Sequence, residues 1–268
     1  MIDLSKIDHS SLDRPEVLMF LFHPRPEWGS PDSDTTNLMI PVEDGVSLGA
    51  RFHMADQSST NLLFFHGNGE IVADYDDLAP YFNRLGINFL PVDYRGYGRS
   101  GGTPTITAMM RDCHKVFNFT RKWFKENGFW GPVVVMGRSL GSAPALEIAA
   151  NYGDQIRGLI IESGFARTEP LLRLLGIDTV ALGIKEGKTF QNIDKIRHFS
   201  TGPTLVIHGE KDHIIPFADG QALYDACGSP DKTLLRIDGA NHNNLFELGL
   251  DSYLKAMGNL NDKIGLPD

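Results

Sequence analysis

Short, almost unbroken apolar runs recur along the chain, and segments with helical spacing separate them. The runs lie at residues 62–65, 87–92, 133–136, 158–161 and 204–207. Strands that read as continuous apolar runs are buried on both faces, as in a parallel sheet covered by helices. The segments with helical spacing are residues 73–85, 105–127, 140–152 and 217–227. Because strand and helix alternate, the pattern predicts the α/β class, with a doubly wound and mostly parallel sheet.

The two ends of the pattern differ from its middle. Residues 1–36 carry closely spaced prolines, which predict an irregular N-terminal arm with one helical turn around residues 16–22. A hairpin is expected next, with strands at 38–42 and 46–54 around an Asp-Gly turn. A last strand at 232–237 and a last helix at 245–257 complete a single α/β domain over residues 37–268.

About forty residues separate the strand that ends at Glu162 from the strand that begins at Thr204. Such a connection is longer than is usual between neighbouring elements. It must contain a crossover helix, and the remainder suffices only for a small cap. We therefore expect a short cap insertion at about residues 164–190.

The overall charge limits the partners that the chain can have. The formal net charge of the 268 residues is -9, and no basic stripe interrupts it, so neither nucleic acid nor anionic lipid is an expected partner. A small-molecule or acyl substrate remains, and the sequence leaves the oligomeric state open. No signal peptide or membrane-spanning run is recognisable, and the only two cysteines, Cys113 and Cys227, are interpreted as packing residues inside helices. These features predict a cytoplasmic protein without integral membrane association.

The motif Gly137-Arg138-Ser139-Leu140-Gly141 follows one predicted strand directly and precedes a predicted helix. A Gly-x-Ser-x-Gly match alone is a weak signal, but this context is that of a nucleophile elbow, whose tight turn requires small flanking residues. The serine then lies at a helix N-terminus, where free N–H groups stabilise negative charge. A nucleotide-binding turn is the alternative, but the glycine pattern of phosphate loops follows no strand here. Ser139 is the predicted nucleophile.

A second glycine-rich loop, His66-Gly67-Asn68-Gly69-Glu70, follows the strand at residues 62–65. An oxyanion formed during acyl transfer needs two N–H donors directed at one point. We expect these donors to be the backbone N–H groups of Asn68 and of Leu140, the residue after the nucleophile. His66 is expected to brace the loop rather than to act as a base.

The predicted base is His242, which follows the strand at 232–237 and a turn. That position lies at the carboxyl edge of the sheet, where ligands bind in such folds. An imidazole, with an ordinary pKa of about 6.5, can accept a proton near neutral pH. A histidine of a surface loop without a catalytic role is the alternative.

The predicted acid is Asp212, in the loop after the strand at 204–207. A carboxylate there would hold the imidazole in one tautomer and stabilise the imidazolium. Glu162, at the end of the preceding strand, is the main alternative, and Asp238 is a third candidate.

The stretch at residues 92–102 superficially resembles a phosphate loop, but no Lys-Ser or Lys-Thr follows its glycines. We expect Asp93 and Arg95 to form local hydrogen bonds and an ion pair that fix a glycine-rich turn.

Taken together, these motifs resemble the α/β-hydrolase family over about residues 38–258. The resemblance is greatest to the branch with little or no cap, which includes acyl-protein thioesterases and dipeptidyl-peptidase-like relatives. It implies an eight-stranded sheet and hydrolysis of esters, thioesters or amides without a cofactor or metal. The nucleophile, acid and base of the family correspond to Ser139, Asp212 and His242.

The sequence therefore predicts a serine hydrolase that cleaves a carboxylic ester or thioester through an acyl-enzyme intermediate. A peptidase of the same fold is one alternative, and a non-catalytic protein that traps a ligand on this fold is the other.

Overall fold

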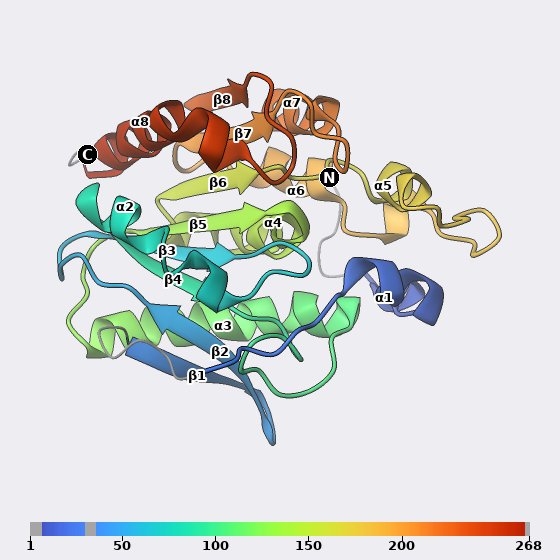
Figure 1. Cartoon of the computed structure of the whole chain (residues 1–268), viewed down its shortest axis with the longest axis horizontal. Coiled ribbons are helices and arrows are strands. Elements are labelled where there is room, and N and C mark those ends of the chain that lie inside the picture. Colours follow the sequence, from blue (N-terminus) through green and yellow to red (C-terminus); the bar gives the residue numbers. More distant parts are fainter. Residues whose placement is uncertain (1–6, 30–35, 266–268) are drawn as a thin grey trace.

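An eight-stranded sheet runs through the computed structural model, which describes residues 7–29 and 36–265 (Figure 1). Its strands are β1 (Thr36–Glu43), β2 (Val46–Phe52), β3 (Thr60–Phe65), β4 (Ile87–Val92), β5 (Val133–Arg138), β6 (Gly158–Glu162), β7 (Thr204–Gly209) and β8 (Lys232–Ile237). Their order in space is β1-β2-β4-β3-β5-β6-β7-β8. Strand β2 is antiparallel to β1 and β4, and the pairings among β3 to β8 are all parallel. The predicted α/β class with a mostly parallel sheet is confirmed.

Helices cover both faces of this sheet. They are α1 (Pro15–Leu21), α2 (Ala79–Arg84), α3 (Ile106–Glu126), α4 (Ser142–Tyr152), α5 (Thr168–Leu174), α6 (Asn192–His198), α7 (Phe217–Ala226) and α8 (Leu245–Gly265). Side chains of α3, α4, α6 and α7 pack in one apolar cluster, and those of α2 and α8 pack in a second one on the other face. The two clusters give the molecule three layers.

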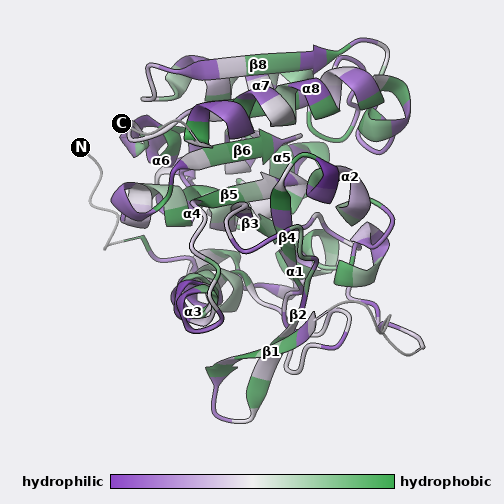
Figure 2. Ribbon diagram, turned by 90° about the vertical axis from the view of Figure 1, so that its left-hand side faces the viewer, coloured by the Kyte–Doolittle hydropathy of each residue, from purple (hydrophilic) through white to green (hydrophobic). Residues whose placement is uncertain are grey.

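The burial of the strands follows from their sequence. Every residue of β3, β4 and β7 is buried, as their continuous apolar runs predict. The edge strand β8 alternates between partly buried and exposed residues, and Figure 2 shows it in mixed colours while β5 and β6 are mostly hydrophobic.

One predicted helix is interrupted. Residues 73–85 form a 3₁₀ turn at Val72–Tyr75 and then the separate helix α2. The prediction of one helical segment overlooked Pro80, which lacks an N–H donor and whose ring would clash with the carbonyl of Asp76 inside a continuous helix. The proline is tolerated at the start of α2, where its N–H is not needed.

Two segments outside the sheet lie beside each other at the edge toward which the parallel strands point. One is α1, from the segment predicted to be an N-terminal arm, and the other contains α5, from the predicted cap (Figure 1). The connection from β6 to β7 also contains α6, which supplies the expected crossover helix. The proposed boundaries of the arm and cap remain predictions, and residues 1–6, 30–35 and 266–268 lie outside the described residues.

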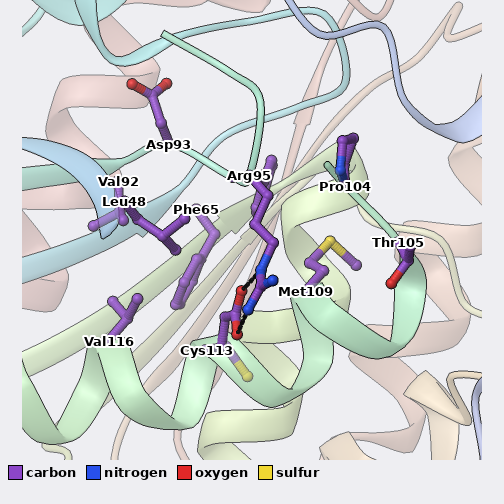
Figure 3. Close-up of a pocket in the computed structure, with 12 residues that line it drawn as sticks. Leu48, Phe65, Val92, Asp93, Arg95, Pro104, Thr105, Met109, Cys113 and Val116 are labelled. Atoms are coloured by element: carbon purple, nitrogen blue, oxygen red, sulfur yellow. Dashed lines mark hydrogen bonds and ion pairs between the residues drawn. The ribbon is translucent and has the colours of Figure 1, made fainter. Parts of the chain in front are cut away.

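The turn after β4 is built differently from the expectation. The guanidinium of Arg95 donates two hydrogen bonds to Asp112 of α3, at 2.6 and 3.0 Å, and also pairs with Glu43. Asp93 instead accepts from the backbone N–H of Val72 at 3.0 Å. Figure 3 shows Asp93 and Arg95 pointing apart around a small, nearly filled cavity. The predicted ion pair between them is wrong, because a partner on α3 is closer to the guanidinium.

Cys113 lies in α3 and Cys227 directly follows α7, and both are buried free thiols. Over residues 7–29 and 36–265, no helix has both the length and the apolar character that crossing a bilayer requires.

Candidate active site

The turn between β5 and α4 holds Ser139 in a conformation that few L-residues adopt. Its φ is +52°, in the left-handed region. The two flanking glycines make this possible, because a Cβ on Gly137 would lie 2.1 Å from the carbonyl oxygen of Gly141. A Cβ on Gly141 would lie 2.0 Å from the carbonyl oxygen of Phe65. The hydroxyl of Ser142 donates to the carbonyl of Ser139 and fixes the turn.

Three predicted residues from distant loops meet at the carboxyl edge of the sheet. The Nε2 atom of His242 lies 2.9 Å from the Oγ of Ser139, and its Nδ1 atom lies 2.7 Å from the Oδ2 of Asp212. All three side chains are buried. The arrangement can pass a proton from the hydroxyl to the imidazole while the carboxylate stabilises the resulting imidazolium.

The environment of Asp212 keeps its carboxyl group ionised. Burial alone would raise its pKa, but hydrogen bonds from His208 and His242 outweigh burial and bring the pKa below the usual range. The backbone N–H groups of Ile214 and Ile215 also donate to its Oδ1, each at 2.9 Å. His208 was not among the predicted site residues, although its place at the end of β7, four residues before Asp212, is a usable signal.

The two rival acids are engaged elsewhere. Glu162 accepts a hydrogen bond from Tyr253 at 2.5 Å and pairs with Arg138, and Asp238 pairs with Arg236. Only Asp212 of the three candidates lies within hydrogen-bonding distance of His242.

The side chain of Asn68 is held by the N-terminal segment and by Tyr97. Its Oδ1 atom accepts hydrogen bonds from the N–H of His23 at 2.7 Å and the hydroxyl of Tyr97 at 2.8 Å. These contacts hold the loop in place. Among the described residues, the backbone N–H groups of Asn68 and Leu140 donate no hydrogen bond. Both residues line the cavity beside Ser139.

That cavity has a volume of about 70 Å³ and uncharged walls. Besides Ser139 and the two residues with free N–H groups, it is lined by Phe20, Leu21, Phe165, Thr168, Leu171, Leu172, Leu175, Phe190, Ile214 and Ile215. The walls thus come from α1, the connection between β6 and β7, and the loop after β7. Sequence reasoning missed these residues, because an apolar side chain that lines a cavity looks the same in sequence as one in the core.

Arg138, directly before Ser139, joins the elbow turn to three other segments. Its guanidinium pairs with Glu70 at 2.5 Å and with Glu162 at 2.9 Å, and it donates to the carbonyl oxygen of His242 at 2.8 Å. Burial opposes its charge, but the two carboxylates outweigh burial and raise its pKa. Apart from the position of Arg138 inside the elbow motif, no sequence pattern indicates these contacts.

The chain matches a known protein family over most of its length. A family model described as serine aminopeptidase, S33, matches residues 56–182 and 179–249, which is more than half of the chain. The chain belongs to the S33 family of α/β-hydrolases. All four loops of the site lie within the matched residues.

Several relatives of this S33 family member are similar over most of its length. Human alpha/beta hydrolase domain-containing protein 17B is 32% identical over 73% of this chain, and the match spans 64% of the length of the human protein. The uncharacterized protein YfhR of Escherichia coli K12 is 26% identical over 90% of this chain and 86% of its own length.

Solved structures share the fold of this S33 hydrolase at low sequence identity. The esterase Pf2001 of Pyrococcus furiosus has a TM-score of 0.73 and 17% identity, covering 90% of this chain and 99% of the other. Est1E of Butyrivibrio proteoclasticus, solved with ferulic acid, has a TM-score of 0.68 and 20% identity, covering 84% of this chain and 100% of the other. The recognition of the α/β-hydrolase fold from sequence motifs is confirmed.

Proposed function

We propose that this protein hydrolyses carboxylic esters or thioesters through an acyl-enzyme intermediate. The observation that carries the proposal is the chain of hydrogen bonds that links Ser139 to His242 and His242 to Asp212. A serine hydroxyl is a weak nucleophile at neutral pH, and an adjacent oriented base activates it.

In the first half of the reaction, His242 takes the proton of the Ser139 hydroxyl while the oxygen attacks the carbonyl carbon. The tetrahedral intermediate then expels the alcohol or thiol, to which the imidazolium returns the proton. In the second half, His242 deprotonates a water molecule that attacks the acyl-enzyme, and the carboxylic acid leaves as Ser139 regains its proton.

The free backbone N–H groups of Asn68 and Leu140 stabilise the negative oxygen of each tetrahedral intermediate. Donors fixed in advance cost no reorganisation when charge develops, and loss of one such donor typically reduces kcat by about 10²–10³. The anchoring of the Asn68 side chain to the end of α1 supports a fixed donor.

The cavity beside Ser139 suits the acyl group. Because one water-sized group needs roughly 10–15 Å³ of such space, about 70 Å³ accommodates roughly five heavy atoms. We therefore expect acyl chains of about four to six carbons to be hydrolysed faster than long ones.

The test is hydrolysis of p-nitrophenyl esters of graded chain length by the wild-type protein and by Ser139→Ala. We expect a rate maximum at short to medium chains and a loss of at least about 10³-fold in kcat/KM in the variant. Undiminished hydrolysis by Ser139→Ala would exclude this mechanism.

The name of the S33 family raises aminopeptidase activity as the second candidate. An aminopeptidase must bind the ammonium group of its substrate, normally with a carboxylate. The lining of the cavity beside Ser139 includes no charged side chain, which favours the ester. Aminoacyl p-nitroanilides tested beside the esters separate the two activities, and faster cleavage of the anilides would support the peptidase.

The negative net charge and the two free buried thiols support the further proposal of a cytoplasmic protein that acts on small acyl substrates rather than on nucleic acid.

A further inference from the structure

A second and larger cavity, of about 450 Å³, lies on the other side of the sheet edge from the cavity beside Ser139. It is bounded by α2 and its preceding turn on one side and by the first part of α8 on the other. The volume lies within the range of small-molecule sites, which is about 300–1,000 Å³. None of the residues that line the two cavities is shared.

Three of the catalytic loops contribute a wall to this second cavity. Glu70 comes two residues after Asn68, Arg138 directly precedes Ser139, and Asn243 directly follows His242. The proposed catalytic side chains themselves face the first cavity or each other. An occupant of the second cavity would therefore touch the backs of the loops that hold the reacting groups.

The remaining walls are mainly aromatic. Tyr75, Phe82, Phe89 and Tyr253 are buried at the base of the cavity, and the partly exposed rings of Tyr81 and Phe246 meet edge to face at 5.5 Å between ring centroids. Phe246 and Tyr253 of α8 meet edge to face at 5.2 Å between ring centroids, and Phe82 of α2 stacks on Tyr253 at 6.5 Å. Aromatic faces carry partial negative charge and attract organic cations within about 6 Å.

The charged residues of the cavity also favour a positively charged ligand. Four carboxylates line it, from Glu70, Asp74, Asp77 and Glu162, against the single guanidinium of Arg138. Arg25 pairs with Asp74, and Arg138 pairs with Glu70 and Glu162 at once. An excess of about two negative charges therefore remains beside the aromatic walls, which disfavours an anion and favours a cation.

We propose that the cavity between α2 and α8 binds an organic cation with an apolar body, such as a substituted or quaternary ammonium compound. The ammonium group faces the carboxylates and the partly exposed rings of Tyr81 and Phe246, and the apolar body lies against Leu78. Through Arg138, which donates to the carbonyl oxygen of His242, the occupant influences the position of the base.

Binding is measured by isothermal titration calorimetry with benzyltrimethylammonium as the probe. The neutral 4-tert-butylbenzyl alcohol and the anionic 4-tert-butylbenzoate are the comparison compounds. We expect saturable binding of one cation per chain, about tenfold tighter than the neutral compound, and no binding of the anion. This measurement needs no catalytic turnover, so its result does not depend on the proposed function.

Two variants connect the binding to this cavity. Leu78→Trp places a larger ring in the space and should abolish binding, with circular dichroism and the melting temperature verifying its fold. Asp77→Asn removes one exposed carboxylate and should weaken binding of the cation by about threefold. Asp251→Asn, an exposed carboxylate of α8 that does not line the cavity, is the matched control and should bind normally.

Phosphonylation of Ser139 fills the first cavity and distinguishes the two sites. We expect the cation still to bind the phosphonylated protein, because the two cavities share no lining residue. Its affinity should change, because the catalytic loops form part of the wall of the second cavity. Equal binding of the neutral compound, full binding by folded Leu78→Trp, or loss of binding only after phosphonylation would each overturn the proposal.

Discussion

At the scale of single residues, the site depends on a backbone conformation that its own side chain does not favour. Ser139 is held at positive φ, which costs of order 1–3 kcal/mol for a residue other than glycine. The turn persists because Gly137 and Gly141 let three backbone segments approach more closely than any side chain allows. The strained conformation of Ser139 is therefore possible only because neither glycine carries a Cβ atom.

The substitution Gly141→Ala should therefore damage the fold as well as the site. Its Cβ would lie 2.0 Å from a backbone oxygen of β3, which cannot move without disturbing the sheet. We expect a loss of about 3 kcal/mol or more in the free energy of unfolding, measured by urea denaturation. Gly187→Ala is the matched control, because its Cβ meets nothing within 4 Å, and equal stability of the two variants would contradict this explanation.

The carboxylate of Asp212 matters through orientation and charge. Asp212→Asn keeps the size of the side chain but can donate where the carboxylate accepts, so the imidazole would adopt the wrong tautomer. We expect kcat for a p-nitrophenyl ester to fall by about 10⁴ with little change in KM. Asp238→Asn, which alters a surface ion pair outside the hydrogen-bonded sequence, should retain wild-type kcat, and the reverse ranking would reassign the acid.

At the scale of elements, sequence patterns predicted the sheet well because burial on both faces leaves a direct trace. The strand β4, buried at every residue, begins and ends where the apolar pattern indicates. The predictions failed where a distant contact decides the outcome. Arg95 pairs with Asp112 of α3, and no local pattern identifies that partner.

In the candidate site, too, local motifs could be predicted from the sequence and contacts between distant segments could not. Ser139 and His242 stand out because each lies in the loop that follows a strand, within a recognisable motif. The cavity beside them could not be predicted, because Phe20 and Phe190 are apolar residues from segments whose packing depends on the whole fold. For the same reason, the sequence predicts an N-terminal arm but does not indicate that this segment lines the cavity beside Ser139.

The wall formed by α5 should determine which acyl chains are accepted. Leu172 is fully buried against the cavity, and Leu172→Ala would enlarge it by about three carbon atoms. We expect the chain length with the highest kcat/KM to increase by two to three carbons, roughly the volume removed. Leu174→Ala, on the same helix but 54% exposed, should leave the chain-length profile unchanged. An identical profile in both variants would place the acyl group elsewhere.

At the scale of the whole molecule, a buried ion pair joins α4 and α6, and a histidine of the N-terminal segment lies near it. Lys195 of α6 is fully buried and pairs with Glu147 of α4 at 2.5 Å. His9 packs nearby against Phe190. Burial first, and then the positive charge of Lys195, lower the pKa of His9 to about 4. The folded protein therefore excludes a proton that the unfolded chain accepts.

This exclusion makes stability depend on pH in a defined window. The ordinary pKa of histidine is about 6.5, so the stabilisation is fully present above that pH and is lost as the pH falls toward 4. His9→Gln should flatten the decline of the unfolding free energy in this window by up to about 1.4 kcal/mol per pH unit, measured by urea denaturation. Between pH 7.5 and 9 the difference between the two proteins should stay constant, and parallel curves from pH 6.5 to 4 would refute the role of His9.

The most direct test of the whole account is covalent labelling with a fluorophosphonate, followed by intact mass measurement and peptide mapping. We predict one adduct per chain, located on Ser139, formed quickly by the wild-type protein and at least about 10³-fold more slowly by His242→Ala. A label on another residue, or equal labelling rates in the presence and absence of the imidazole, would contradict the proposal that His242 activates Ser139.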